Sequence, residues 1–229
     1  MTTALYSGNL GLGHDLETIV RAVSELNGRV ALTVHLVGTG KARPLLEQLV
    51  GHLGLTNVEF YPPVPLQGLP VLLRKGDIHF VSQRAGTQGL IVPSKIYGIL
   101  AIGRPTVFIG PKDSEVASII RESRSGIIVR PGDVHGTAKA TLELALDREL
   151  RITMGMRARK YYQQHLGQDK SVARIVRAIE AVVEPLPVAP TLASSTASAE
   201  DEVTRDLAPI PVQGIPQSRP STDKVPERP

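Results

Sequence analysis

The stretch that decides the fold reads GTQGLIVPSKIYGILAIGRP and spans Gly86–Pro105. A glycine-bearing loop leads into Pro93 and Ser94, where the fixed φ of proline and the capping tendency of serine predict a helix start. Apolar residues then occupy a helical face until Gly103, where the helix is expected to end before a β-branched strand. A helix N-terminus that carries a lysine, here Lys95, can hold an anion. A lone lysine in this position is also typical of a solvated surface, so the surrounding sequence is needed to choose between an anion site and a surface charge.

Short apolar stretches alternate with amphipathic ones outward from this unit, over residues 4–183. The apolar stretches predict strands at about 4–7, 30–37, 57–61, 77–82, 105–109 and 126–129. The amphipathic stretches predict helices at about 15–26, 42–53, 68–74, 93–102, 114–122, 134–146, 148–166 and 169–183.

Apolar strands separated by helices favour an α/β fold with a doubly wound, Rossmann-like parallel sheet of about six strands. Ligands bind such a sheet outside the carboxyl ends of the strands, at the point where the strand order reverses. We therefore expect the loops at 8–14 and 86–95, which follow the first and fourth strands, to flank a binding crevice.

The composition excludes several kinds of site. The chain has no cysteine, and its six histidines lack metal-ligand spacing, so no thiolate or metal site is expected. No dinucleotide, phosphate-loop or nucleophile-elbow motif is complete, so we expect no cofactor and the sequence assigns no catalytic residue. There is neither an export signal nor an apolar run of ~20 residues, which predicts a cytoplasmic protein without a transmembrane segment.

Charge and proline content divide the chain in two. Seven acidic and four basic residues lie from Glu184 onward, which leaves 22 basic and 15 acidic residues, or +7, on residues 1–183. That charge suits phosphate-bearing ligands or an anionic membrane surface, whereas nucleic acid is not expected because no dense basic run is interleaved with aromatics. Nine of the 18 prolines lie from Pro185 onward among Ser, Thr and Ala. We predict one lobe at 1–184 and a disordered tail at 185–229.

The loop after the first expected strand, at 8–14, reads GNLGLGH. Its glycines would let backbone N–H groups approach a diphosphate ahead of the helix that Asp15 is expected to cap, although a flexible connector is the alternative. His14 could donate to a phosphate or simply begin the helix. The glycines at 38–40 are predicted to form a turn beside the same crevice.

Several segments, in this order, resemble the C-terminal lobe of GT-B-fold glycosyltransferases of the family-four type, similar to colanic-acid and O-antigen transferases. They include YSGNLGLGHDLETIVRA (6–22), LVGTGKARPLLEQL (36–49), NVEFYPPV (57–64), GLIVPSKIYGILAIGRPTVFIGP (89–111) and SGIIVRPGD (125–133). The most specific of them is VPSK-x-Y-G-I-L-A-x-G-R-P.

The resemblance implies that this lobe binds a UDP- or GDP-linked sugar. The residues that it implies near the diphosphate are Gly8, Asn9, Gly11, Gly13, His14, Ser94 and Lys95. The loop of Val64 would present backbone groups to the base, and Arg84 would reach the donor phosphates. Glu115 would bond donor hydroxyls or cap its own helix.

Two departures from the family pattern concern the donor. The two glutamates, eight positions apart, that many relatives carry correspond to Leu90 and Gly98 here, so ribose recognition by such a pair is not expected. The arginine and lysine usual in the first loop are replaced at about the places of Asn9 and His14. Lys95 is therefore the clearest cation for a diphosphate.

No segment of the chain resembles the N-terminal, acceptor-binding lobe of that family. We expect the donor-binding half of a glycosyltransferase of hexosyl type, acting in surface polysaccharide or glycoconjugate synthesis with a separate acceptor-binding lobe or subunit. Such a partner could also bring it to the inner face of the cell membrane. The alternative is a truncated, non-catalytic module that binds nucleotides or other proteins.

Overall fold

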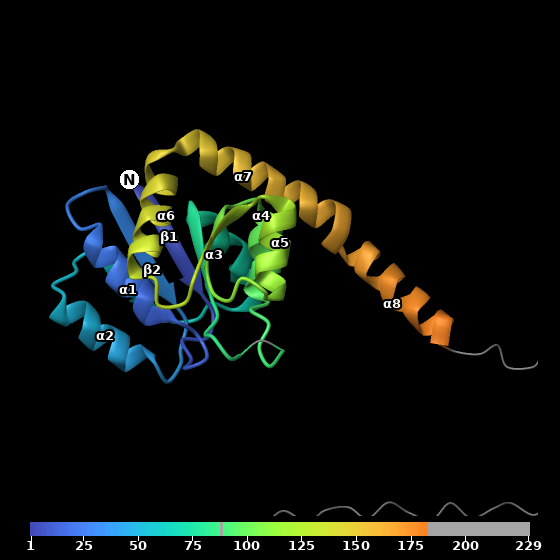
Figure 1. Ribbon diagram of the computed structural model, residues 1–229, viewed down its shortest axis with the longest axis horizontal. Coiled ribbons are helices and arrows are strands. Elements are labelled where there is room, and N and C mark those ends of the chain that lie inside the picture. Colours follow the sequence, from blue (N-terminus) through green and yellow to red (C-terminus); the bar gives the residue numbers. More distant parts are fainter. Residues whose placement is uncertain (88, 183–229) are drawn as a thin grey trace, which may run out of the picture. The chain divides into compact units, whose positions relative to one another are not determined.

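The computed structural model describes residues 1–87 and 89–182, in which six strands form a parallel sheet with helices on both faces (Figure 1). The strands are β1 (Thr2–Ser7), β2 (Leu32–Val37), β3 (Val58–Tyr61), β4 (Ile78–Ser82), β5 (Thr106–Ile109) and β6 (Gly126–Val129). The helices are α1 (Leu16–Glu25), α2 (Arg43–His52), α3 (Leu69–Lys75), α4 (Lys95–Ile102), α5 (Glu115–Ser123), α6 (Val134–Leu146), α7 (Arg148–Tyr161) and α8 (Gln168–Val182). A 3-10 turn at Leu66–Gly68 precedes α3, and a π-helical segment at Tyr162–Leu166 follows α7. The expected doubly wound fold is confirmed, whereas the tail predicted at 185–229 lies outside the described residues.

The strands follow the order β3-β2-β1-β4-β5-β6. The chain winds outward from β1 to β3, returns to the other side of β1 as β4, and continues to β6. Because every neighbouring pair is parallel, all the carboxyl ends of the strands meet at one edge of the sheet. The order reverses between β1 and β4, and the loops that follow these two strands therefore begin side by side.

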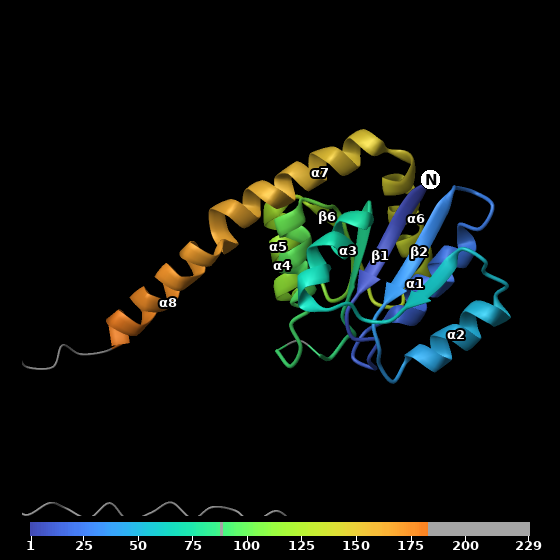
Figure 2. The ribbon, with the colours of Figure 1, turned by 180° about the vertical axis from the view of Figure 1, so that it is seen from behind.

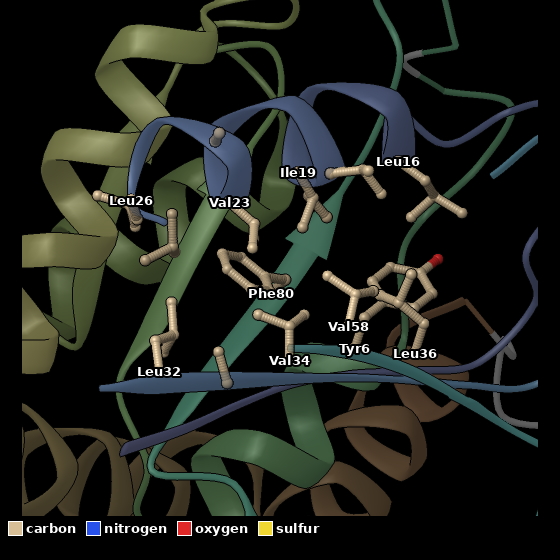
Figure 3. Packing of buried hydrophobic residues seen from close by; sticks show 14 of the residues in the cluster. Tyr6, Leu16, Ile19, Val23, Leu26, Leu32, Val34, Leu36, Val58 and Phe80 are labelled. Carbon is tan, nitrogen blue, oxygen red and sulfur yellow. The ribbon is translucent and has the colours of Figure 1, made fainter. Parts of the chain in front are cut away.

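Each face of the sheet buries its own cluster of aliphatic residues, as expected for a chain without tryptophan. Helices α1, α2 and α6 cover one face, and α3, α4 and α5 cover the other (Figures 1 and 2). Figure 3 shows Ile19 and Val23 of α1 directed toward Phe80 of β4, and all three are buried. Burial of each such side chain contributes about 1.5–3 kcal/mol to folding.

Two helix caps expected from the sequence are wrong. The Asp15 side chain caps no N–H of α1, because its carboxylate accepts hydrogen bonds from the Thr18 hydroxyl at 2.8 Å and from the Gly132 N–H at 2.7 Å. It thereby ties the loop before α6 to the start of α1. Ser94 precedes α4 with φ −58° and ψ −16° and makes no side-chain cap bond. A residue that is already helical cannot turn its hydroxyl onto the first N–H groups of its helix.

The loops after β1 and β2 pack backbone against backbone. Gly38 has a φ of +143°, and a Cβ atom at this position would overlap the carbonyl oxygen of Gly8. The Gly8 N–H donates to the carbonyl of Val37 at 2.9 Å, and the Leu10 N–H donates to that of Thr39 at 2.8 Å. The two loops thus fit together only because Gly38 lacks a side chain.

Replacing Gly38 with alanine should lower the free energy of unfolding by about 2–4 kcal/mol, because the substitution adds backbone strain to a clash with main-chain atoms. Urea unfolding followed by circular dichroism measures the change. Gly51→Ala in α2 is the matched control, since nothing lies within 4 Å of its Cβ position and alanine favours the helix. An unfolding midpoint for Gly38→Ala equal to that of the unaltered protein would contradict the prediction.

Candidate functional site

The candidate site lies at the carboxyl edge of the sheet, where the strand order reverses. A cavity of about 380 Å³ opens there between the β1 loop, α3 and the start of α4. A second cavity of about 360 Å³ extends toward β2 and shares part of its lining with the first, namely Ser7, Gly8, Asn9 and Leu69. We refer to the two together as the carboxyl-edge crevice.

The structure brings most of the sequence-selected residues to this crevice. The first cavity is lined by Gly8, Asn9, His14, Ser94 and Lys95. Val64 lines the second, together with Gly38 and Thr39 of the turn after β2. Arg84 is exposed and lines a neighbouring groove of about 270 Å³, which also contains His14.

Three selected residues have other surroundings. Gly13 lies against Ile91, whose Cδ1 atom would be 2.6 Å from a Cβ atom on the glycine, and Gly11 lies against the side chain of Asn9. The carboxylate of Glu115 accepts a hydrogen bond from the Tyr97 hydroxyl at 2.7 Å. Glu115 does not cap α5, because that position belongs to Ser114.

The β1 loop uses some of its backbone donors within the protein and leaves others free. The N–H groups of Gly8 and Leu10 bind the β2 loop, and the Tyr6 hydroxyl donates to the Asn9 carbonyl at 2.9 Å. Among the described residues, the N–H groups of Asn9, Gly11 and Gly13 have no protein acceptor. The Leu12 N–H also has no acceptor among the described residues, and of these four residues only Asn9 lines the crevice.

Lys95 is the first residue of α4 and lines the first cavity. The Nζ atom is 3.5 Å from the centroid of the Tyr6 ring, and a Cβ atom added to Gly8 would approach it to 3.1 Å. Nζ is buried and has no hydrogen-bond partner among the described residues. Burial lowers the pKa of Lys95 from 10.5 to about 7.

This environment disfavours a cation in two ways. Desolvation favours the neutral amine, and the start of a helix carries positive potential. The Tyr6 ring offsets part of this cost by a cation–π contact. A bound anion would compensate for both effects.

His14 closes the end of the same cavity. Its Nδ1 atom lies 2.6 Å from the Ser82 carbonyl oxygen, which can only accept, so Nδ1 carries the proton and Nε2 is unprotonated in the neutral ring. Burial lowers the pKa of His14, and the nearby charge of Lys95 lowers it further, against an opposing effect of the Ser82 hydrogen bond. At neutral pH the His14 ring is therefore neutral, and its Nε2 atom can accept but not donate a hydrogen bond.

Several residues of the site were not singled out from the sequence. Tyr6 reads as an ordinary strand residue, yet its ring lies under the Lys95 ammonium. Leu69 and Leu73 form the apolar wall of the first cavity beside Gly98, where a Cβ atom would come within 3.1 Å of Leu73. The only sequence pattern that indicated this wall was the helical spacing of apolar residues in α3 and α4, and any packed helix has that spacing.

Two negative findings concern the described residues. They include no cluster of three or more His, Cys, Asp or Glu side chains that could hold a metal ion. None of their helices combines the length and apolar content needed to cross a bilayer.

Known proteins with this fold include glycosyltransferases. TarM of Staphylococcus aureus, solved with UDP among its ligands, is 16% identical, with a TM-score of 0.64 over 77% of this chain and 35% of TarM. HepE of Anabaena, solved with UDP and glucose, is 17% identical, with a TM-score of 0.68 over 79% of this chain and 48% of HepE. At sequence identities this low, the similarity to TarM and HepE shows a shared fold and nothing more.

Sequence comparison identifies the family to which the chain belongs. WcaI of Escherichia coli K12, provisionally assigned as a colanic acid biosynthesis glycosyl transferase, is 35% identical over 125 residues, which are 55% of this chain and 30% of WcaI. The chain thus covers less than a third of that relative. The family model described as glycosyl transferases group 1 matches residues 2–147. Because this match covers more than half of the chain and agrees with the fold, the chain belongs to the group 1 glycosyl transferase family.

Proposed function

We propose that this chain is the donor-binding half of a glycosyltransferase and that the carboxyl-edge crevice binds a nucleoside diphosphate sugar. The observation that carries the proposal is the buried Lys95 ammonium, which has no anionic partner among the described residues and lies at the start of α4. The diphosphate would lie between Lys95 and the free N–H groups of the β1 loop. Ser94, exposed beside Lys95, would add a hydroxyl donor.

The second cavity offers a place for the nucleoside. Its wall joins Pro63 and Val64 to Gly38 and Thr39, which presents backbone groups and an apolar surface to a flat base. UDP is the first ligand to test, because TarM and HepE were solved with UDP. Gly98 lies at the place of a glutamate common in relatives, so α4 would hold the donor by its N-terminus rather than along its side.

The proposed reaction transfers a glycosyl group to an acceptor hydroxyl in polysaccharide or glycoconjugate synthesis, in keeping with the family and with WcaI. The bond between the anomeric carbon and the diphosphate oxygen breaks, and a bond from that carbon to the acceptor oxygen forms. The acceptor hydroxyl releases its proton and the nucleoside diphosphate leaves. Lys95 and the N-terminus of α4 would stabilise the charge that develops on the diphosphate.

Transfer would require an acceptor-binding lobe, and we propose that a separate lobe or subunit supplies it. WcaI is much longer than the region matched here, which leaves room in such relatives for another lobe. Exposed apolar residues line one face of α8 at the i, i+3, i+4 and i+7 spacing, namely Val172, Ile175, Val176 and Ile179. This face suits docking of that lobe.

A non-catalytic module that binds the nucleotide is the alternative, favoured by the leucine and glycine at positions 90 and 98. Incubation with UDP-glucose, alone and with candidate acceptor lobes, separates the two. Release of UDP supports the transferase, and binding without any release supports the module.

Lys95→Met should weaken UDP binding by roughly 10- to 100-fold, because a charge-assisted contact to the diphosphate contributes about 1.5–3 kcal/mol. Isothermal titration calorimetry measures the dissociation constant. Lys160→Met, at an exposed position of α7, is the matched control and should bind UDP like the unaltered protein.

The stability of Lys95→Met separates a binding role from a structural one. Methionine keeps the apolar stem and removes a buried charge without a partner, so the free energy of unfolding should stay equal or rise. A Lys95→Met protein that is folded and binds UDP with unchanged affinity would refute the proposal.

UDP affinity should fall as the pH rises from about 7 to about 9. Free Lys95, with a pKa of about 7, loses its proton over this range and must regain it to bind the diphosphate. The limiting slope is about tenfold per pH unit. Titrations in buffers of different ionisation enthalpy should detect proton uptake on binding. Lys95→Met should lack this dependence, and a flat profile for the unaltered protein would count against the role of Lys95.

A further inference from the structure

Another cavity, separate from the carboxyl-edge crevice, lies at the opposite edge of the sheet, where the strands begin. Its volume is about 500 Å³, larger than either part of the carboxyl-edge crevice. α7 crosses this edge, at which the N-terminus of the chain also lies (Figure 1). The lining includes five arginines, namely Arg74, Arg104, Arg148, Arg151 and Arg159. We call it the arginine cavity.

The cavity is built by close packing of α4 on α7. A Cβ atom on Gly155 would overlap the carbonyl oxygen of Gly103, which ends α4 with a φ of +68°. This contact holds one face of α7 against the ends of α3 and α4. The arginines of that face are therefore fixed around the cavity by the fold.

Three of the arginines also close the C-terminal ends of helices. Arg104 donates to the carbonyl of Arg74 in α3 at 3.0 Å, Arg159 donates to that of Ala101 in α4, and Arg151 donates to that of Ala145 in α6 at 3.0 Å. The negative potential at helix ends stabilises cations there. Capping accounts for these three positions, but each guanidinium retains further N–H groups.

The side chains of Arg74 and Arg148 cap no helix end, although Arg74 lies in the last turn of α3. Neither side chain donates a hydrogen bond within the described part of the chain, and the only acidic partner of Arg148 is Glu149, 3.7 Å away and as exposed as the arginine. Asp77 is the one carboxylate of the lining, and it accepts from the Thr3 N–H at 2.9 Å without forming an ion pair with any of the five arginines. The five arginines of the lining thus outnumber the two carboxylates near them, Asp77 and Glu149, and the cavity has an excess of positive charge.

The ligand that this charge fits is a phosphate group, which guanidinium groups bind through paired hydrogen bonds. Two apolar side chains beside the arginines indicate where the phosphate comes from: Ile152 is 38% exposed and Met156 is 61% exposed, and both line the same cavity. Exposed apolar groups next to cations suit the boundary between lipid headgroups and acyl chains. A free phosphate compound would gain nothing from them.

We propose that the arginine cavity binds the phosphate of acidic phospholipid headgroups and so holds this lobe directly on an anionic membrane surface. α7 would face the bilayer, with Ile152 and Met156 at headgroup depth. The carboxyl-edge crevice, at the other edge of the sheet, would stay open to its ligand. This membrane site is independent of the proposed donor site and needs no partner subunit.

The test is co-sedimentation of the full chain with vesicles of phosphatidylcholine, alone or with a quarter of phosphatidylglycerol. Binding is expected only to the anionic vesicles and should weaken as salt is added. Arg74→Gln with Arg148→Gln should reduce the partition coefficient by about 25-fold, at about fivefold for each cation near the surface. These two side chains make no hydrogen bonds in the structure, so the thermal unfolding midpoint should not change.

The control removes the same charge elsewhere, through Arg130→Gln with Lys139→Gln. Both side chains are exposed, lie after β6 and on α6, and do not line the cavity, so the partition coefficient should change less than about twofold. Equal losses in the two double variants, or no binding of the unaltered protein to anionic vesicles, would overturn the proposal. A soluble phosphate compound is the other ligand that could fit the cavity, and calorimetric titration with glycerol 3-phosphate tests it. If glycerol 3-phosphate binds as tightly as the anionic vesicles do, the cavity is a site for a soluble phosphate compound instead.

UDP binding should be the same in both double variants, which separates this test from that of the donor site.

Discussion

Parallel pairing of β1 with β2 on one side and with β4 on the other is the constraint on which the rest of the structure depends. It brings all the carboxyl ends of the strands to one edge and places loops from residues 8–14 and 86–95 next to each other. The backbone contact between Gly8 and Gly38 fixes the first of these loops against β2. The second delivers the start of α4, with Lys95, to the far wall of the same cavity.

The two edges of the sheet hold positive charge for opposite physical reasons. At the carboxyl edge, Lys95 occupies a helix N-terminus, where both the helix dipole and burial oppose a cation. At the other edge, the guanidinium groups of Arg104, Arg151 and Arg159 bind carbonyls at the C-termini of α3, α6 and α4, where the dipole favours a cation. The first arrangement lowers the pKa of its cation, and a nearby anion would raise that pKa again. The second is stable by itself, and the proposed phosphate site depends on Arg74 and Arg148, which cap no helix end with their side chains.

The elements could be predicted from the sequence because their signals are local. Strand β6 and helix α6 have the predicted bounds, and the other strands begin within about two residues of the expected positions. The expected caps failed because they depend on backbone dihedrals and on distant partners. Ser94 is already helical, and the carboxylate of Asp15 is taken by Thr18 and by Gly132, which lies more than a hundred residues away in the chain.

The sequence by itself determined the doubly wound fold and the place of the crevice and singled out Lys95, because alternating apolar segments and a lysine at a helix start are patterns within short windows. Only the tertiary structure decided how deeply that lysine is buried and therefore how far its pKa is lowered. Its charge is exceptional because Tyr6, Gly8 and the cavity walls exclude water and supply no anion, and these neighbours come from separate parts of the chain. The arginine cavity likewise joins α3, α4 and α7, whose arginines lie from 74 to 159 in the sequence and share no local pattern. Desolvation and electrostatic potential depend on what surrounds a charge, and for this chain folding alone creates those surroundings.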